Sequence, residues 1–420
     1  MRAQMQVMAQ RIDTLEGQLT EARASAEAAR SAVAAIPQQP AATASAKPAT
    51  EISWDGAPKL TASGGWSFKP RGRMQLDVAG VNAPNSLVSR QKLGIGTEFR
   101  RAYIGFDGTI PGGFGYRVEA DLANSGVDLT DVYLTYKASP QITITAGQHK
   151  PFQSMEDMTS DLFTSFMERA AFNSAFGFER RVGLSATYTG KQVLVQAGVF
   201  ADDAKSLNTD SNNSYSVDGR VVFMPKLGNA QLHLGASAHY RDFNDWPNIA
   251  AYNARPFTHT TDLRLVSTPN IPATGETHYG LEGAWVSGRF HATAESAWMT
   301  AHRPGLSDPT FNGGYAEVGY LLTNDVTPYK NGAYDRIRPK TPLGKGGIGA
   351  LQLNARYDWL DLNDAGVIGG RQQVAGVSLV WIPTDYTRFV VNYGHLWLDD
   401  AAVAAGNSRS YNADTLGLRA

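Results

Sequence analysis

Three cationic side chains stand at alternate positions early in the sequence: Lys69, Arg71 and Arg73. They belong to the stretch WSFKPRGRMQLDV, whose other face carries only apolar side chains: Trp66, Phe68, Met74, Leu76 and Val78. Because successive side chains of a strand point to opposite faces, this pattern predicts a strand with one apolar side and one cationic side. Guanidinium groups on one face match the oxygens of phosphate. An edge strand of a soluble sandwich is the simplest alternative.

Other reactive chemistry has little support. The chain has no cysteine, which excludes disulfides, thiolate metal sites and a cysteine nucleophile. Its eight histidines lack the spacing of metal ligands; His233 and His239 share a face but lie about 20 Å apart on an extended strand. The GIG run at 94–96 lacks the strand and helix of a nucleotide site. We expect no enzymatic activity, catalytic residue, cofactor or metal; a barrel hydrolase with a Ser/His pair within reach is the less favoured alternative.

Composition sets further bounds. The chain has 420 residues, of which 42% are hydrophobic, and a formal net charge of −1, which gives no indication of nucleic acid as a partner. No run of about 18 apolar residues occurs, so a transmembrane helix is not expected. The first residues, MRAQMQVMAQRIDTLEGQ, lack the apolar core of a signal peptide, so secretion cannot be read from them directly.

The N-terminal segment has a different period from the rest. Its apolar or small residues alternate in steps of four and three, as in the a/d seam of a coiled coil: Met1, Met5, Met8, Ile12, Leu15, Leu19, Ala22, Ala26, Ala29, Val33 and Ile36. We predict a periplasmic coiled-coil oligomerisation helix over 1–36 and a Pro/Ala-rich linker over 37–58. A single amphipathic surface helix is the alternative.

From Trp66 onward the period is two. Sixteen segments follow this pattern, near 66–79, 99–108, 114–123, 128–137, 140–149, 182–190, 193–200, 215–224, 230–241, 277–287, 289–300, 313–322, 348–362, 371–382, 385–396 and 409–420. Short connections follow the even-numbered segments, and longer polar or Gly-rich loops follow most odd-numbered ones. The long stretch 323–347 is an exception, because a short turn is expected there.

An even number of such strands, with short turns at one end and long loops at the other, is typical of a bacterial outer-membrane barrel. The barrel must close because lipid offers no partner to unpaired backbone groups. Sixteen strands leave a water-filled lumen instead of a side-chain core. We therefore predict an all-β fold, a 16-stranded antiparallel transmembrane β-barrel over 59–420, preceded by the coiled coil, with the three cations facing the lumen.

Several separated motifs resemble the phosphate-selective porin O and P family: GRMQLD (72–77), FRRAYIGFDG (99–108), MERAAF (167–172), AHYRDF (238–243), YGLEGAW (279–285), YAEVGYLLT (315–323), YDWLDL (357–362) and GVSLVWIPTDYTRFVVNYGH (376–395). They occur in the right order from about 60 to the C-terminus. The resemblance implies a trimeric sixteen-stranded channel in the outer membrane of a Gram-negative bacterium, with an arginine-lined lumen and an anion site at its constriction. It also implies a long turn after the twelfth strand, as found at 323–347.

The same resemblance assigns residues to the central binding zone: Arg73 of GRMQ, Arg100, Arg101 and Tyr103 of FRRAY, and Asp131 of TDVYLTY. Strict alternation would aim Arg100 away from Arg101, so Arg100 needs a bulge or a strand end to contribute. Asp131 is either an acid that holds the arginines and weakens binding enough for release, or a plain salt bridge. The remaining expected pore-lining cations are Lys69, Arg71 and Arg117.

A long Phe-rich loop at about 150–181 lies between the fifth and sixth segments. We expect it to fold into the lumen and narrow it; an extracellular flap or trimer latch is the alternative. Where phosphate-selective members supply lysines, this loop has Asp157 and Leu162, which leaves Thr159 and Ser160 as hydroxyl donors. A weaker anion preference, or a channel for phosphorylated or other polar solutes, is therefore at least as well supported as high phosphate affinity.

The sequence thus predicts an outer-membrane porin for passive diffusion of small polar solutes, with a preference for anions such as phosphate or phosphorylated solutes. Its expected partners are two further copies in a homotrimer, outer-membrane lipid and lipopolysaccharide, and small anionic solutes, with no nucleic acid. The alternative is a general or weakly selective porin whose coiled coil, roughly 50 Å long, also spaces or tethers the envelope through cell-wall components.

Overall fold

The computed structural model describes residues 17, 20–21, 23–27, 50–54, 56–87, 93–123, 126–207, 213–244 and 248–420. The chain forms two units, Met1–Ala49 and Thr50–Ala420. In the first unit, the described residues 17, 20–21 and 23–27 are helical and exposed, and the rest of the predicted coiled coil lies outside the described residues. Within the described part of the chain, no helix combines the length and the apolar character needed to cross a bilayer.

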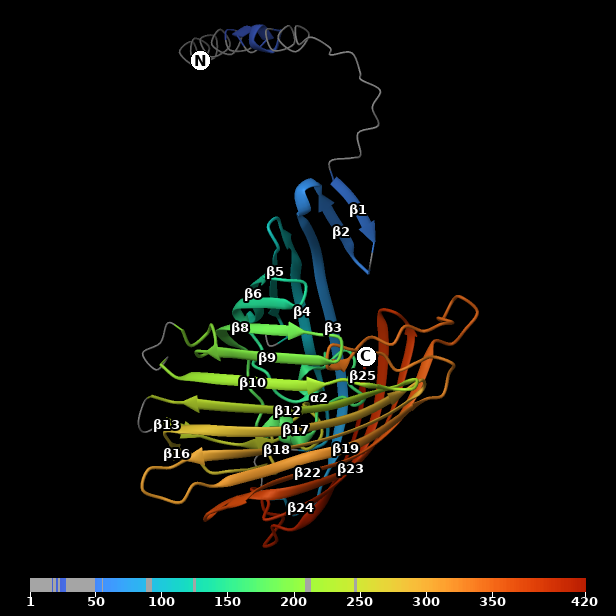
Figure 1. Cartoon of the computed structure of the whole chain (residues 1–420). Helices are drawn as coiled ribbons and strands as arrows, with labels where there is room; N and C mark the ends of the chain where they lie inside the picture. The colour runs from blue at the N-terminus through green and yellow to red at the C-terminus, as the bar shows by residue number, and fades with distance from the viewer. Residues whose placement is uncertain are drawn as a thin grey trace, which may run out of the picture. The chain divides into compact units, whose positions relative to one another are not determined.

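The second unit is a closed antiparallel barrel of sixteen strands (Figure 1). In chain order the strands are β3 (Ser67–Asn82), β4 (Ile95–Ile110), β5 (Phe114–Asp121), β6 (Asp128–Lys137), β7 (Ile142–His149), β8 (Arg181–Thr189), β9 (Val193–Phe200), β10 (Tyr215–Phe223), β12 (Ala230–Asp242), β17 (Gly275–Ser287), β18 (Phe290–His302), β19 (Thr310–Leu321), β22 (Ala350–Asp364), β23 (Val367–Thr384), β24 (Thr387–Asp399) and β25 (Tyr411–Arg419). Pairing of β25 with β3 closes the barrel.

Each predicted segment overlaps one of these strands, so the sixteen-stranded barrel is confirmed. The period of two predicted these strands well, because side chains that face lipid are apolar and side chains that face the lumen are polar, and the two kinds alternate along every strand. The long connection at 323–347 is also present, and it carries a small hairpin of β20 (Tyr329–Lys330) and β21 (Ala333–Tyr334). A two-residue strand, β11 (Lys226–Leu227), pairs with the start of β12.

A hairpin precedes the barrel where the sequence predicted the end of a linker. Its strands β1 (Thr50–Trp54) and β2 (Pro58–Ala62) pair with each other, and β2 pairs with the start of β3. The turn between them contains Gly56 with a φ of 73°, a left-handed conformation that favours glycine. The predicted linker over 37–58 therefore overlaps a strand pair. The 3₁₀ turn η1 (Ser63–Gly65) connects the hairpin to β3.

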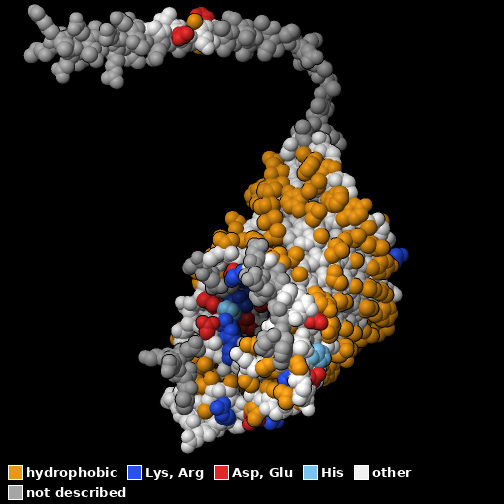
Figure 2. Space-filling model, turned by 90° about the vertical axis from the view of Figure 1, so that its left-hand side faces the viewer, with side chains coloured by type: hydrophobic (Ala, Val, Ile, Leu, Met, Phe, Trp, Pro, Cys, Tyr) orange, Lys and Arg blue, Asp and Glu red, His pale blue; other side chains and the backbone are white. Residues whose placement is uncertain are grey.

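The two faces of the barrel wall differ as expected for a membrane protein. Large apolar side chains such as Leu281, Trp285 and Leu353 are about half exposed on the outer face. Figure 2 shows apolar side chains covering the outside, while Lys, Arg, Asp, Glu and His side chains gather in a hollow of the face in view. Charged side chains on the inner wall, such as Arg220 and Glu282, are almost fully buried.

A hydrophobic core lies inside the barrel, which corrects the expectation of a lumen without one. It combines Phe166, Phe172 and Phe176 of the β7–β8 loop with Tyr252 and Leu265 of the β12–β17 loop, and packs on wall residues such as Phe311, Leu360 and Leu396. The first loop carries α2 (Met155–Met158) and α3 (Ala171–Ala175); the second carries β13 (Asn248–Ala250), β14 (Asn253–Ala254), β15 (Val266–Ser267) and β16 (Ile271–Ala273). The apolar residues of the two loops fill space that barrel strands alone leave open.

Candidate functional site

The β7–β8 loop, residues 150–180, crosses the lumen to the opposite wall. At the start of α2, the backbone N–H groups of Met155 and Glu156 each donate to the Glu295 carboxylate of β18 at 2.8 Å. Further along, the Ala171 N–H donates to Asp358 of β22 at 2.7 Å. These bonds join residues about 140 to 190 positions apart in the chain. The loop therefore narrows the lumen from within.

The β12–β17 loop also turns inward. The Phe257 ring packs on Phe166 of the first loop, with ring centroids 5.7 Å apart, and a side chain at Gly394 of β24 would collide with it. On the other side, His259 contacts the Glu98 carboxylate of β4 at 2.8 Å. Two loops, not the single one that the sequence indicated, thus share the lumen.

Two bulges interrupt the strands beside these loops. On β3 and β4, Gln75 pairs with Arg101 and Leu76 with Phe99, so Arg100 is an extra residue in the ladder. The bulge that Arg100 required is therefore present, and it lets two consecutive arginines face the lumen. A second bulge lies on β5 and β6, where Val118 pairs with Val132 and Ala120 pairs with Leu129. Two residues of β6, Thr130 and Asp131, therefore stand opposite one residue of β5.

A cavity of about 420 Å³ remains between the two loops and the β4 wall. Seven cationic side chains line it: Arg100, Arg101, Lys150, Arg169, Arg180, Arg255 and Arg264. Four carboxylates line it as well: Asp157, Asp161, Glu168 and Glu179. Cations therefore outnumber carboxylates around this cavity in the described part of the chain.

Asp161 of the loop links two wall arginines. Its carboxylate lies 2.6 Å from Arg73 Nη1 and 2.6 Å from Arg101 Nε. Burial alone would raise the pKa of Asp161, but the guanidinium groups of Arg101 and Arg73 hold it well below its usual range. The Arg73 guanidinium also lies 4.0 Å above the centre of the Tyr103 ring. Asp161 therefore stays charged and fixes the position of both arginines.

Two more carboxylates fix arginines in the same way. Glu168 of the loop lies 3.3 Å from Arg100 and 2.7 Å from Arg419 of β25. Burial would raise the pKa of Glu168, but Arg100 and Arg419 lower it. Asp131 of β6 lies 2.6 Å from Arg180. Ion pairs thus join the loop to the wall on the β3–β6 side and at the adjoining strand β25.

Lys150, the first residue of the loop, has an unusual environment. Its ammonium group donates to the Asp157 carboxylate at 2.7 Å, and Arg169 lies 3.6 Å from the same carboxylate. Burial lowers the pKa of Lys150 to about 8, although Asp157 opposes the shift. The charge of Lys150 therefore changes in a pH range where ordinary lysines stay protonated.

Of the predicted residues, Arg100, Arg101 and Tyr103 line the cavity. Arg73 does not line the cavity itself but forms an ion pair with Asp161, which does. Arg117 and Asp131 lie 3.7 Å apart on the adjoining wall. Arg71 pairs with Asp107 at 2.8 Å, further along β3, and Lys69 stands opposite Asp107 in the strand register. The eight predicted residues of the barrel wall therefore separate into a group at the cavity and a group on the wall beyond it.

Thr159 and Ser160, the two hydroxyl donors that the sequence singled out, do not line this cavity. Thr159 is buried; its hydroxyl donates to the Met155 carbonyl and accepts from the backbone N–H of Tyr334. Ser160 accepts from the N–H of Leu162 at 3.4 Å. Their hydrogen bonds are made within the protein, because the loop needs them to hold its turns.

Sequence reasoning missed most of the loop cations. Lys150 is the first residue of the β7–β8 loop, Arg169 lies within the motif MERAAF, and Arg180 is the last residue of the loop. Arg255 and Arg264 lie in the inward β12–β17 loop. The usable signal was the length of the second loop, about 30 residues between two strands, since loops of that size in compact domains are usually functional.

The cavity suits solute passage better than catalysis. Fixed guanidinium groups can bind an anion briefly, and the acids beside them lower the affinity so that the anion can leave. No three His, Asp or Glu side chains among the described residues lie close enough together to hold a metal ion.

A closed barrel with an apolar outside and a charged lumen narrowed by loops is a channel of the outer membrane. The profile of the phosphate-selective porin O and P family matches residues 68–420, and the chain belongs to that family.

Two relatives are similar to this chain in sequence, and two solved structures are similar to it in fold. A protein of Caulobacter vibrioides described as uncharacterized is 46% identical over 100% of this chain and 87% of its own length. Porin O of Pseudomonas aeruginosa is 27% identical over 72% of this chain and 74% of its own. An anion-selective porin from Comamonas acidovorans has a TM-score of 0.52, with 15% identity, 84% of this chain and 99% of the porin covered. The outer-membrane channel DcaP of Acinetobacter baumannii has a TM-score of 0.51, with 11% identity, 86% of this chain and 98% of DcaP covered.

Proposed function

We propose that this channel passes small polar solutes by passive diffusion and prefers anions, phosphate and phosphorylated solutes among them. The observation that supports it best is the excess of cations over carboxylates around the cavity between the two inward loops and the β4 wall. A cation-rich pore with low-dielectric walls raises the local concentration of anions and excludes cations.

The preference is moderate. Arg73, Arg100 and Arg101 already have carboxylate partners on the loop, so an incoming anion must share them. Arg264 differs, because its hydrogen bonds go to the neutral acceptors Asn253 Oδ1 and the Asp262 carbonyl. The description of the family as phosphate-selective and the name of the anion-selective porin from Comamonas acidovorans support the same preference.

The test is a single-channel recording in a planar bilayer under a KCl gradient, followed by titration with phosphate. We expect a reversal potential that indicates anion preference and a chloride current that phosphate reduces. Arg101→Gln should weaken both effects, whereas Arg371→Gln, which removes a half-exposed arginine outside the cavity, should not. A cation-preferring channel that phosphate leaves unaffected would contradict the proposal.

We also propose that the chain forms a homotrimer, assisted by the 1–36 segment as a periplasmic coiled coil. The helical residues 17, 20–21 and 23–27 support this idea, as does the trimer form of OmpT from Vibrio cholerae, whose TM-score is 0.50. The mass in detergent should be three times that of the chain. Removal of residues 1–49 should leave conductance intact and weaken the trimer; loss of envelope spacing in cells carrying this variant would support the additional tethering role.

A further inference from the structure

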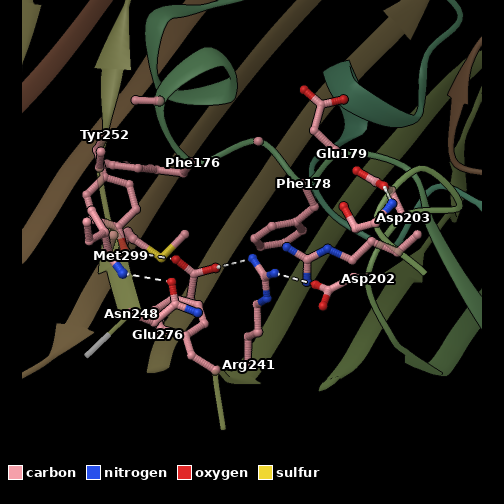
Figure 3. A pocket seen from close by; sticks show the side chains of 18 of the residues that line it. Phe176, Phe178, Glu179, Asp202, Asp203, Arg241, Asn248, Tyr252, Glu276 and Met299 are labelled. Carbon is pink, nitrogen blue, oxygen red and sulfur yellow. Dashed lines mark hydrogen bonds and ion pairs between the residues drawn. The ribbon is translucent and has the colours of Figure 1, made fainter. Parts of the chain in front are cut away.

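A second cavity, of about 350 Å³, lies beside the constriction. The end of the β7–β8 loop, the β9–β10 loop and the β12–β17 loop enclose it, and it shares residues 177–180 with the first cavity (Figure 3). Its apolar lining comes from several rings and a thioether: Phe176, Phe178, Phe243, Tyr252 and Met299. The Phe178 ring stacks on His239 of β12 with ring centroids 3.9 Å apart, which fixes its orientation.

Most charged groups around this cavity already have partners. Figure 3 shows Arg241 between two carboxylates, those of Asp202 and Glu276. Arg241 lies 2.7 Å from Asp202 and 3.7 Å from Glu276, and Tyr252 donates its hydroxyl to Glu276 at 2.9 Å. Asp203 accepts from the Ser206 N–H at 2.8 Å. The interactions of these groups are therefore largely satisfied without a solute.

Arg181, at the start of β8, is different. Its side chain lines the cavity, is only 7% exposed as a residue, and lies 5.8 Å from the Phe178 ring centre. Its backbone pairs with His149 in the strand ladder, but its guanidinium group forms no hydrogen bond or ion pair with any residue in the described part of the chain. A second cation, Arg241, lines the same cavity, but it is already paired with Asp202 and Glu276. A buried guanidinium without a partner and near a like charge is unfavourable unless an anion binds.

We propose that this cavity binds a small organic monocarboxylate with an aromatic body. Arg181 donates to the carboxylate, and the ring lies against Phe176, Phe178 and Tyr252. A monoanion fits better than phosphate, because Glu179, Asp202, Asp203 and Glu276 also line the cavity and repel a second negative charge. The inference rests on the proposed anion-preferring channel and names one class of its solutes.

Residues 177–180 separate this cavity from the constriction and line both. A carboxylate held at Arg181 therefore lies beside the path of smaller anions. Its binding reduces their current, which makes occupancy measurable without a label.

The experiment measures the block of chloride current by benzoate, acetate and inorganic phosphate in the full-length wild-type channel. Benzoate should block at a concentration about tenfold lower than acetate, because acetate has no ring to place on the aromatic side chains. In Arg181→Gln the benzoate block should weaken about tenfold, and phosphate block should change little, since a charge-assisted hydrogen bond contributes about that much. Arg181→Lys, which keeps the charge without the planar fork, should give an intermediate value.

Arg371→Gln is the matched control, because Arg371 lines neither cavity and its side chain is 52% exposed. If Arg181→Gln yields no channels, Phe178→Leu provides the test. Benzoate should block the wild-type channel at a lower concentration than cyclohexanecarboxylate does, and the Phe178→Leu channel should lose this difference. Equal block by benzoate and acetate in the wild type, or unchanged benzoate block in Arg181→Gln or Phe178→Leu, would overturn the inference. A cation-selective reversal potential would instead overturn the proposed channel function, so the two failures are distinguishable.

Discussion

The two sides of the lumen hold the same loop by different means. On the β17–β24 side, Phe166 and Phe172 of the β7–β8 loop are buried in a hydrophobic core, and Arg356 of β22 lies between Glu156 and Glu317 with almost no exposure. On the β3–β6 side, the loop meets the wall through ion pairs that line an open cavity. The first side fixes the loop by burial, and the second keeps charges where a solute can compete for them.

The largest expected effect follows from removing part of the buried side. Phe172→Ala should lower the free energy of unfolding by about 3–5 kcal/mol, because Phe172 is 1% exposed and its loss leaves a cavity in the core. Denaturant unfolding in detergent measures this change. Phe99→Ala, which truncates an outward ring that is 54% exposed, should cost less. Equal losses in both variants would mean that the internal core does not stabilise the loop.

Substitutions on the β3–β6 side should change the ion selectivity of the channel instead of its stability. Asp161→Asn removes the carboxylate shared by Arg73 and Arg101, so both guanidinium groups become available to solutes. We expect a stronger anion preference and phosphate block at a concentration about tenfold lower. The control is Asp308→Asn, on the β18–β19 loop beside His302. A channel whose phosphate block does not change would contradict the role assigned to Asp161.

The anion preference set by the β3–β6 side should also depend on pH. Lys150 is a cation below its pKa of about 8 and neutral above it, so anion preference should fall as pH rises through this range. Reversal potentials recorded between pH 6 and pH 10 measure the effect. Lys150→Met should abolish this step and show the lower preference throughout. An ordinary lysine would stay charged to about pH 10, so a flat profile up to there would rule out the shifted pKa.

The smallest expected effect concerns Glu179, an exposed carboxylate that lines both cavities. Glu179→Gln removes a negative charge near Arg181, so benzoate should block at a concentration about twofold lower, a change typical of solvent-screened charges. Benzoate titration of the chloride current is the measurement. Weaker block than in the wild type would mean that Glu179 helps to hold the ligand.

The barrel was predictable because lipid imposes a strict rule on every strand. Outward residues such as Leu281 and Leu353 are apolar, and each strand repeats the pattern independently, so errors at single positions matter little. The inward arginines of β3 and β5 could be placed by the same alternation.

The loop contacts could not be predicted in this way. Asp161 meets Arg73 across 88 positions, and the Ala171 N–H meets Asp358 across 187. No local pattern encodes such pairs. The inward fold of the β12–β17 loop depends on space for Phe257 beside Gly394, and a glycine in a strand gives no indication of what will fill the space beside it. Thr159 illustrates the same limit, since its hydroxyl bonds to Met155 and Tyr334 within the protein.

Because of the bulge at Arg100, the charge that faces the lumen depends on the number of residues in the strand as well as on their types. Deleting one residue between Glu98 and Tyr103 would restore simple alternation and leave a single arginine facing inward at this point. Related channels could thus gain or lose a lumen cation through a one-residue insertion or deletion, while every other side chain of the strand keeps its face. Alignments that place gaps freely in this strand would hide such a change.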